Sequence, residues 1–131
     1  MQLLGIDYGR KKIGLAKADT ASQVALPLEV LENQGESKVL DELEQRCHSL
    51  GIEAIVIGLP KSLAGQYSSQ TEETEAFAQH LERRTGLPVY RVDERLSTRQ
   101  AENLLQQQGS GADEDAVAAM LILQSYLDQQ E

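Results

Sequence analysis

Residues 5–16 read Gly-Ile-Asp-Tyr-Gly-Arg-Lys-Lys-Ile-Gly-Leu-Ala, a pattern that predicts two strands joined by a short basic turn. The apolar run at 3–6 leads into Asp7, so this carboxylate is expected at the end of a buried strand. The glycines that flank the turn allow a backbone or a phosphate group to come close. Asp7 is therefore suited to hold a metal ion or to act beside a phosphate, although aspartate also serves ordinary turns.

The length and composition indicate one soluble domain. A chain of 131 residues supplies one substantial core, so we expect a single domain over 1–131. The sequence opens directly into an apolar strand without a basic and apolar leader, and no apolar run approaches the roughly 18 residues of a membrane span. We therefore expect a cytoplasmic protein without membrane contact.

The chain is poor in side chains that bind zinc. Its one cysteine, Cys47, cannot form an internal disulfide, and the two histidines, His48 and His80, belong to no cluster with zinc-type spacing. Any bound metal ion is therefore expected to have oxygen ligands.

The formal charge of −9 opposes nonspecific binding to nucleic acid, because phosphate is repelled. The acids are concentrated near the end of the chain, however, since residues 100–131 contain six acids and no lysine or arginine. The basic residues lie earlier, with groups at 10–17 and 91–99. These groups could contact phosphate or form ordinary solvated surface.

Hydrophobic periodicity predicts the remaining elements. The patterns indicate strands at 24–31, 52–59 and 87–92, and helices at 36–50, 69–85, 97–108 and 113–129. Pro27 favours an edge strand, the continuous apolar run at 54–57 favours a strand in the sheet centre, and Ser69-x-x-Glu72 has the spacing of a capping box. The order describes an α/β protein with a ribonuclease H-like fold, a five-stranded mixed sheet with helices on both faces.

Four motifs, in this order, resemble the YqgF/RuvX family. They are the hairpin at 5–16, Gly-Leu-Pro at 58–60, Asp-Glu-Arg-Leu-Ser-Thr at 93–98 and Asp-x-x-Ala-Ala-x-x-Ile-Leu from 115. The resemblance extends from residue 3 to about residue 127. Members of this family are described as Holliday-junction-resolvase-like nucleases that mature the 5′ end of pre-16S ribosomal RNA. The resemblance thus implies a nuclease that acts in ribosome biogenesis.

Hydrolysis of a phosphodiester requires an activated water and stabilisation of the charge on the attacking and leaving oxygens. Two Mg²⁺ or Mn²⁺ ions about 3.5–4 Å apart can supply both. Asp7, Glu94 and Asp115 come from distant parts of the chain, yet this fold can gather them at one sheet edge. We therefore predict that these three carboxylates are catalytic and hold the metal.

Two of these acids have close competitors. Asp113 and Glu114 also precede the last helix, where acids favour the helix N-terminus, but Asp113 is better placed as the N-cap. Asp93 competes with Glu94. Resolvases that this family resembles end their fourth strand in an acid, whereas residues 58–60 contain none, so Glu94 must substitute from the fifth strand. One-metal and two-metal sites both remain open.

Other side chains are candidates for substrate binding. Lys12, Arg95 and Arg99 are predicted to contact phosphates beside the scissile bond, since arginine suits bidentate contact with phosphate. Tyr8, Tyr67 and Tyr90 could stack on unpaired bases, but an aromatic content of 4% shows no stacking platform in the sequence. Ser97 and Thr98 are helix caps rather than nucleophiles, because no base accompanies them.

The predicted function is an internal cut in structured RNA, with a four-way DNA junction as the next candidate substrate. No residue distinguishes RNA from DNA. The acidic charge favours guidance by a ribosomal particle or a partner protein. Either a monomer or a homodimer is possible, because only a symmetric junction requires two-fold symmetry. A non-catalytic ribosome-assembly module remains open, whereas an ATP-dependent phosphotransferase of the actin and Hsp70 group would need a second domain.

Overall fold

The computed structural model describes residues 1–60, 68–93 and 113–129. The strands are β1 (Gln2–Tyr8), β2 (Lys12–Asp19), β3 (Val24–Glu32), β4 (Ala54–Leu59) and β5 (Val89–Asp93). The helices are α1 (Glu36–Leu50), α2 (Ser69–Thr85) and α4 (Glu114–Gln129). The predicted helix at 97–108 lies outside the described residues. None of the helices in the described part of the chain is both long and apolar enough to cross a membrane.

The five strands form one mixed sheet in the order β3-β2-β1-β4-β5. β1, β2 and β3 are antiparallel neighbours, whereas β4 is parallel to β1 and β5 is parallel to β4. The predicted edge position of the Pro27 strand is confirmed, since β3 is the outermost strand of this sheet. β4 is interior and fully buried, as predicted for an apolar run, but the middle strand is β1.

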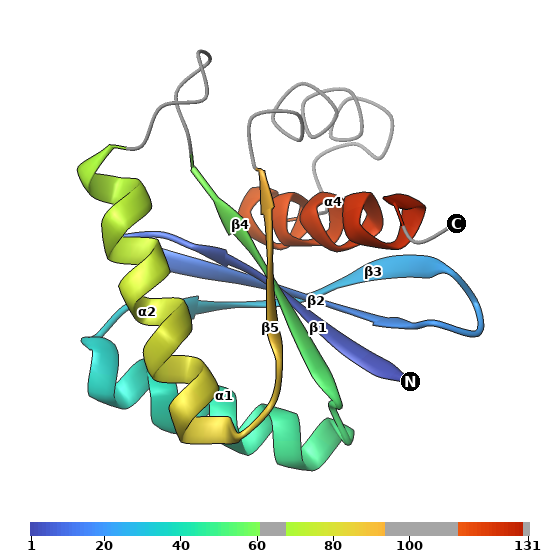
Figure 1. Ribbon diagram of the computed structural model, residues 1–131, viewed down its shortest axis with the longest axis horizontal. Coiled ribbons are helices and arrows are strands. Elements are labelled where there is room, and N and C mark those ends of the chain that lie inside the picture. The colour runs from blue at the N-terminus through green and yellow to red at the C-terminus, as the bar shows by residue number, and fades with distance from the viewer. Residues whose placement is uncertain (61–67, 94–112, 130–131) are drawn as a thin grey trace.

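Helices cover both faces of the sheet, which confirms the predicted architecture (Figure 1). α1 and α2 lie on one face, where Leu43 and Phe77 pack on β1, β2 and β4. α4 lies on the other face, where its apolar side chains pack on Leu3 and Val56. Each face of the sheet therefore carries its own core, and a side chain's position in its strand decides which core it joins.

The helix ends follow from local sequence. α1 ends at Gly51, which adopts the left-handed conformation with φ 64° that glycine tolerates best. α2 begins at Ser69, as predicted, but its capping box starts one residue earlier than the predicted one. Ser68, rather than Ser69, is its N-cap, because the Ser68 hydroxyl accepts from the Thr71 amide at 3.3 Å while the Thr71 hydroxyl accepts from the Ser68 amide at 3.1 Å. Thr71, at the third helical position, therefore accepts the hydrogen bond from the N-cap amide that Glu72 was expected to accept.

Candidate active site

The carboxyl ends of three strands meet at one edge of the sheet. Because β1, β4 and β5 are mutually parallel, Tyr8, Leu59 and Asp93 end their strands at the same edge. Ligands of α/β proteins commonly bind at such carboxyl ends. Asp7, one residue before the end of β1, and Asp93, the last residue of β5, therefore lie toward the same edge.

Asp7 lies on the face of the sheet that α4 covers. Side chains alternate between the two faces along a strand. In β1, Leu4 and Ile6 join the core of α1 and α2, whereas Leu3 joins the core of α4. Asp7 continues the series of Leu3 and Gly5, so its carboxylate belongs to the α4 face, where it is half-buried.

A glycine in β2 lets α4 approach next to Asp7. Gly14 is the register partner of Asp7 in the β1–β2 pair. A Cβ at Gly14 would overlap the carbonyl oxygen of Asp115 and would lie 3.0 Å from the Ala116 amide nitrogen. Only glycine lets the first turn of α4 come this close to the strand. The structure therefore brings the backbone of Asp115 next to Gly14, the register partner of Asp7.

The three acids at the start of α4 have different positions. The Asp113 carboxylate accepts from the Asp115 amide at 3.0 Å, and the Asp113 carbonyl accepts from the Val117 amide at 3.0 Å, so Asp113 begins the helix as its N-cap. Asp115 is half-buried and one turn before Ala119, which faces β1. Glu114 is exposed. The predicted assignment of Asp113 to the cap agrees with these contacts.

Asp93 belongs to the opposite face from Asp7. In β5, Val89 joins the core of α1 and α2, and the Arg91 guanidinium pairs with Glu75 and Glu82 of α2 at 2.7 and 3.1 Å. Asp93 continues this series, so its side chain belongs to the α2 face. Asp7 and Asp93 thus lie toward the same edge of the sheet, but their side chains belong to opposite faces.

Three predicted site residues, Glu94, Arg95 and Arg99, lie outside the described residues. Among the described residues, no group of three or more histidines, cysteines or acids is placed to hold a metal ion. Asp7 and Asp115 supply only carboxylate oxygens, which suit hard divalent cations. Magnesium is commonly bound by one or two carboxylates together with waters and substrate phosphates.

Lys12 lies at the same edge as Asp7. It is the first residue of β2, exposed, and two positions before Gly14, so its side chain also belongs to the α4 face. Its carbonyl oxygen lies only 2.5 Å from the position of a Cβ at Gly9, so glycine is needed there for the turn to close. Lys12 therefore places a positive charge on the same side of the hairpin as the Asp7 carboxylate.

The tyrosines named by the sequence have unequal positions. Tyr8 stacks on Phe77 with ring centroids 4.0 Å apart, on the face opposite Asp7, and burial raises the pKa of its hydroxyl. Tyr67 lies outside the described residues. Tyr90 stacks on Tyr126 of α4, with centroids 5.2 Å apart. Sequence reasoning missed Tyr126, because no local pattern reports a contact between β5 and α4.

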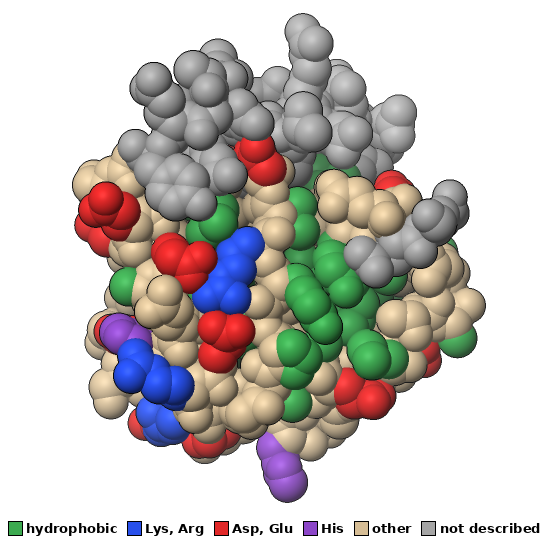
Figure 2. Space-filling model, in the orientation of Figure 1, with side chains coloured by type: hydrophobic (Ala, Val, Ile, Leu, Met, Phe, Trp, Pro, Cys, Tyr) green, Lys and Arg blue, Asp and Glu red, His purple; other side chains and the backbone are tan. Residues whose placement is uncertain are grey.

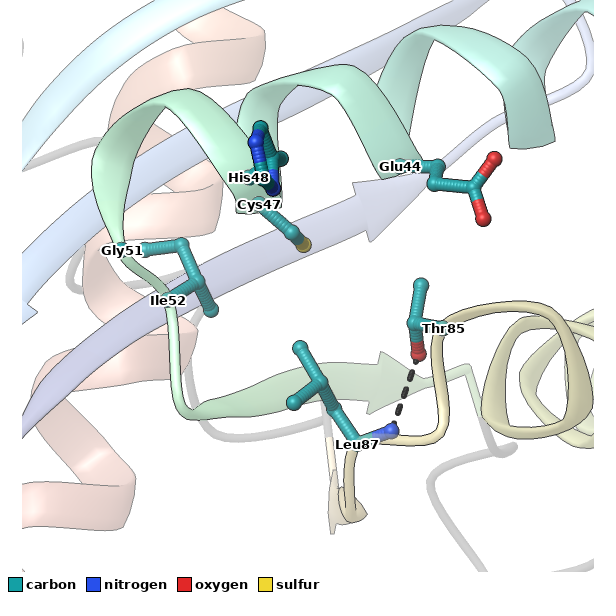
Figure 3. Close-up of a pocket in the computed structure, with 7 residues that line it drawn as sticks. All are labelled: Glu44, Cys47, His48, Gly51, Ile52, Thr85 and Leu87. Atoms are coloured by element: carbon teal, nitrogen blue, oxygen red, sulfur yellow. Dashed lines mark hydrogen bonds between the residues drawn. The ribbon is translucent and has the colours of Figure 1, made fainter.

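A cavity of about 410 Å³ lies elsewhere, between the end of α1 and the turn after α2 (Figure 3). It is lined by Glu44, Cys47, His48, Gly51, Ile52, Thr85 and Leu87. In Figure 3 the Thr85 hydroxyl accepts a hydrogen bond of 3.2 Å from the Leu87 amide, which closes the turn. Burial raises the pKa of the Cys47 thiol to about 11, so the thiol is protonated at neutral pH. Cys47 is thus a packing residue, as its place on the first predicted helix suggested.

Alkylation of Cys47 should be slow in the folded protein. At pH 8 a thiol with a pKa of about 11 carries far less thiolate than an unfolded cysteine with a pKa near 8.5, so we expect a rate at least about 100-fold lower than in denaturant. Mass spectrometry after timed exposure to iodoacetamide measures both rates. Raising the pH should speed the reaction of the folded chain through pH 10. Equal rates in the folded and denatured chains would contradict the burial of Cys47.

Comparison with known proteins identifies a family. The family model described as "RuvX: Holliday junction resolvase" matches residues 1–129. A protein of Anaeromyxobacter sp. (strain Fw109-5), named "Putative pre-16S rRNA nuclease", is 40% identical over 98% of this chain and 97% of its own length. A protein of the same name from Desulforudis audaxviator is 38% identical over 100% of this chain and 96% of its own. The resemblance predicted from the four motifs is confirmed.

A solved structure supports the fold. The RuvC protein of T. thermophilus, in complex with a Holliday junction substrate, superimposes with a TM-score of 0.66 over 99% of this chain and 96% of its own. The two sequences are 15% identical, so the likeness concerns the fold. It confirms the ribonuclease H-like architecture predicted from the order of strands and helices.

Proposed function

Because this chain belongs to the RuvX family of nucleases, we propose that it is a metal-dependent endonuclease that processes the 5′ end of pre-16S ribosomal RNA. The observation that carries the proposal is the closeness of the Asp115 backbone to Gly14, the register partner of Asp7, which supports a site shared by the two acids. Full-length relatives named for this RNA support the substrate.

The proposed metal ligands are Asp7, Glu94 and Asp115, and the ion is Mg²⁺ or Mn²⁺. A bound divalent ion supplies a nucleophilic water at neutral pH and stabilises negative charge on the phosphate oxygens. Asp7 belongs to a paired strand and the Asp115 backbone lies against Gly14, and both observations support this assignment. The α2-side position of Asp93 favours Glu94 as the third acid.

Basic side chains would hold the substrate beside these acids. Lys12 lies on the Asp7 side of the hairpin, and we propose that it contacts a phosphate next to the scissile bond. We assign the same role to Arg95 and Arg99, which follow Glu94 closely in the sequence. Phosphate contacts fix the register of a nucleic acid without reading its sequence.

The net charge of −9 supports guided rather than free binding. Repulsion of phosphate lowers nonspecific affinity, so we propose that a ribosomal particle or a partner protein presents the RNA. We propose that the protein acts on this substrate in the cytoplasm. We also propose that residues 1–131 form one domain. No symmetric substrate is involved, so a monomer suffices.

A second candidate function is the resolution of four-way DNA junctions, which the description of the matching family model favours. A junction with two-fold symmetry requires two active sites related by two-fold symmetry, and therefore a homodimer. Self-association of the chain thus separates the two candidates.

Removal of the metal tests the proposed chemistry. We expect a chelator to abolish cleavage of a pre-16S fragment, and excess Mg²⁺ or Mn²⁺ to restore it, because in this proposal the divalent ion supplies the nucleophilic water and the charge stabilisation. Gel analysis of an end-labelled fragment and of a labelled four-way junction, each with and without metal, measures both substrates. Ca²⁺ serves as the control ion of equal charge but different coordination.

Each pattern of cleavage has one meaning. Metal-dependent cleavage of the RNA alone supports the proposal, and cleavage of the junction alone supports the second candidate. Cleavage that continues in the chelator contradicts a metal-dependent site. Binding of RNA without cleavage under any of these conditions would identify a non-catalytic module instead.

A further inference from the structure

Two tyrosines form an aromatic pair at the surface. Tyr90 of β5 and Tyr126 of α4 stack with ring centroids 5.2 Å apart and planes inclined by 25°. Tyr90 is 42% exposed, so part of its ring remains open to solvent while Tyr126 supports it. Hydrophobic side chains gather on this surface, beside β5 and on the α4 side (Figure 2).

The pair lies on the same side of the sheet as Asp7. Val92 joins the core of α4, so Tyr90, two residues before it in β5, belongs to the α4 face as Asp7 does. The register aligns Gly5 with Val56 and Val56 with Tyr90. Tyr90 therefore lies two strands away from β1, in register with Gly5, which is two residues before Asp7. Ordinary strand spacings place Tyr90 about 12 Å from Asp7.

The sheet between the two positions is buried. Gly58 follows Val56 by two residues in β4, so it belongs to the α4 face and presents no side chain there. Val92, its register partner in β5, is 6% exposed. Gly58 and Val92 are thus both buried, and the exposed ring of Tyr90 is the part of β5 on this face that a base could reach.

We propose that Tyr90, supported by Tyr126, is a platform on which an unpaired base of the nucleic-acid substrate stacks close to the cut. This inference rests on the proposed nuclease function. Stacking on an aromatic ring suits any base whose face is free, and unpaired bases have free faces that base pairs inside a duplex lack. It also adds affinity without positive charge, which matters for a chain with a net charge of −9. Burial raises the pKa of the Tyr126 hydroxyl, so the supporting ring stays neutral.

A binding experiment in chelator tests the platform without cleavage. The probes are a fluorescently labelled single-stranded RNA of twelve nucleotides and the same RNA in a duplex, with affinity measured by anisotropy. We expect Tyr90→Ala to weaken binding of the single strand about tenfold and binding of the duplex by less than about twofold. Tyr90→Phe keeps the ring and should bind within about twofold of the wild type.

Leu26→Ala is the matched control, because Leu26 is also exposed and apolar but lies on β3, the other outermost strand. It should bind both RNAs as the wild type does. Circular dichroism melts of all variants check that Tyr90→Ala remains folded. Since Tyr90 is substantially exposed, we expect only a small change in its melting temperature.

The inference is overturned if Tyr90→Ala binds the single strand as the wild type does, if Tyr90→Phe loses as much affinity as Tyr90→Ala, or if the wild type does not bind the single strand. A change in sedimentation without a change in RNA binding would instead identify the patch as an interface between copies of this chain. Ring-dependent binding without any cleavage in metal would keep the platform and refute the nuclease. Cleavage with ring-independent binding would refute the platform alone.

Discussion

Asp7→Asn is expected to lower the rate of RNA cleavage by at least about 100-fold, because asparagine keeps the shape of the side chain but removes the charge that holds a cation. The same loss is expected for Asp115→Asn, which lies against Gly14 at the start of α4. Single-turnover cleavage of a labelled pre-16S fragment at saturating Mg²⁺ measures the rates. Thermal melts should show that both variants remain folded.

Asp113→Asn is the matched control for Asp115→Asn. Asp113 is two residues away in the same helix, carries the same charge, and caps the helix through its carboxylate. Asparagine caps helices about as well as aspartate does, so stability should be retained and cleavage should change by less than about twofold. Equal losses of cleavage rate for Asp113→Asn and Asp115→Asn would show that cleavage needs only negative charge at the start of α4, and not a carboxylate at position 115. Wild-type rates for Asp7→Asn would refute the proposed site.

Gly14→Ala should nearly abolish cleavage although Gly14 has no side chain to contribute. The added methyl would overlap the Asp115 carbonyl, and a backbone group cannot move aside without moving the whole first turn of α4. Displacement of a catalytic group by about 1 Å can cost about 100-fold in rate, which is the loss that we expect. The overlap should also lower the free energy of unfolding by about 1–3 kcal/mol.

Gly5→Ala separates the effect on the site from the effect on stability. A methyl at Gly5 would lie 2.8 Å from Leu123 Cβ and 3.0 Å from the Ala119 carbonyl oxygen, so it also presses on α4 but away from Asp115. Its cost in urea-induced unfolding should resemble that of Gly14→Ala, whereas its cleavage rate at a temperature where both variants are folded should fall by less than about fivefold. Parallel losses of rate in both variants would mean that Gly14 affects only stability.

The sequence predicted the elements well because their signals are local. The apolar alternation around Asp7, the helical spacing that ends at Gly51 and the buried run of β4 each depend on neighbours within a few residues. The capping box of α2 was misplaced by one residue, because Ser68 and Ser69 are equally good caps by type. Only the Thr71 hydroxyl, which bonds back to the Ser68 amide, distinguishes them.

The arrangement of the candidate site was only partly predictable. Helical phase favoured Asp115 over Asp113, and the cap contact of Asp113 agrees with that choice. Nothing in the sequence indicated that Gly14 would receive the backbone of Asp115, since a contact between β2 and α4 depends on how the helix crosses the sheet. The face of the sheet to which Asp93 belongs was likewise not predictable, because it follows from the ion pairs between Arg91 and α2. These are tertiary effects that local patterns do not contain.

The close packing of α4 on Gly5 and Gly14 has a consequence during protein synthesis. The ribosome makes α4 after all five strands of the sheet, so a nascent chain can pair β1 to β5 while the second carboxylate of the proposed site is still absent. Until the helix docks, its apolar face and the sheet beneath it are both uncovered, and such surfaces are prone to aggregate. With the proposed site, the enzyme would be inactive toward a ribosomal RNA precursor until α4 has been translated and has docked on the sheet.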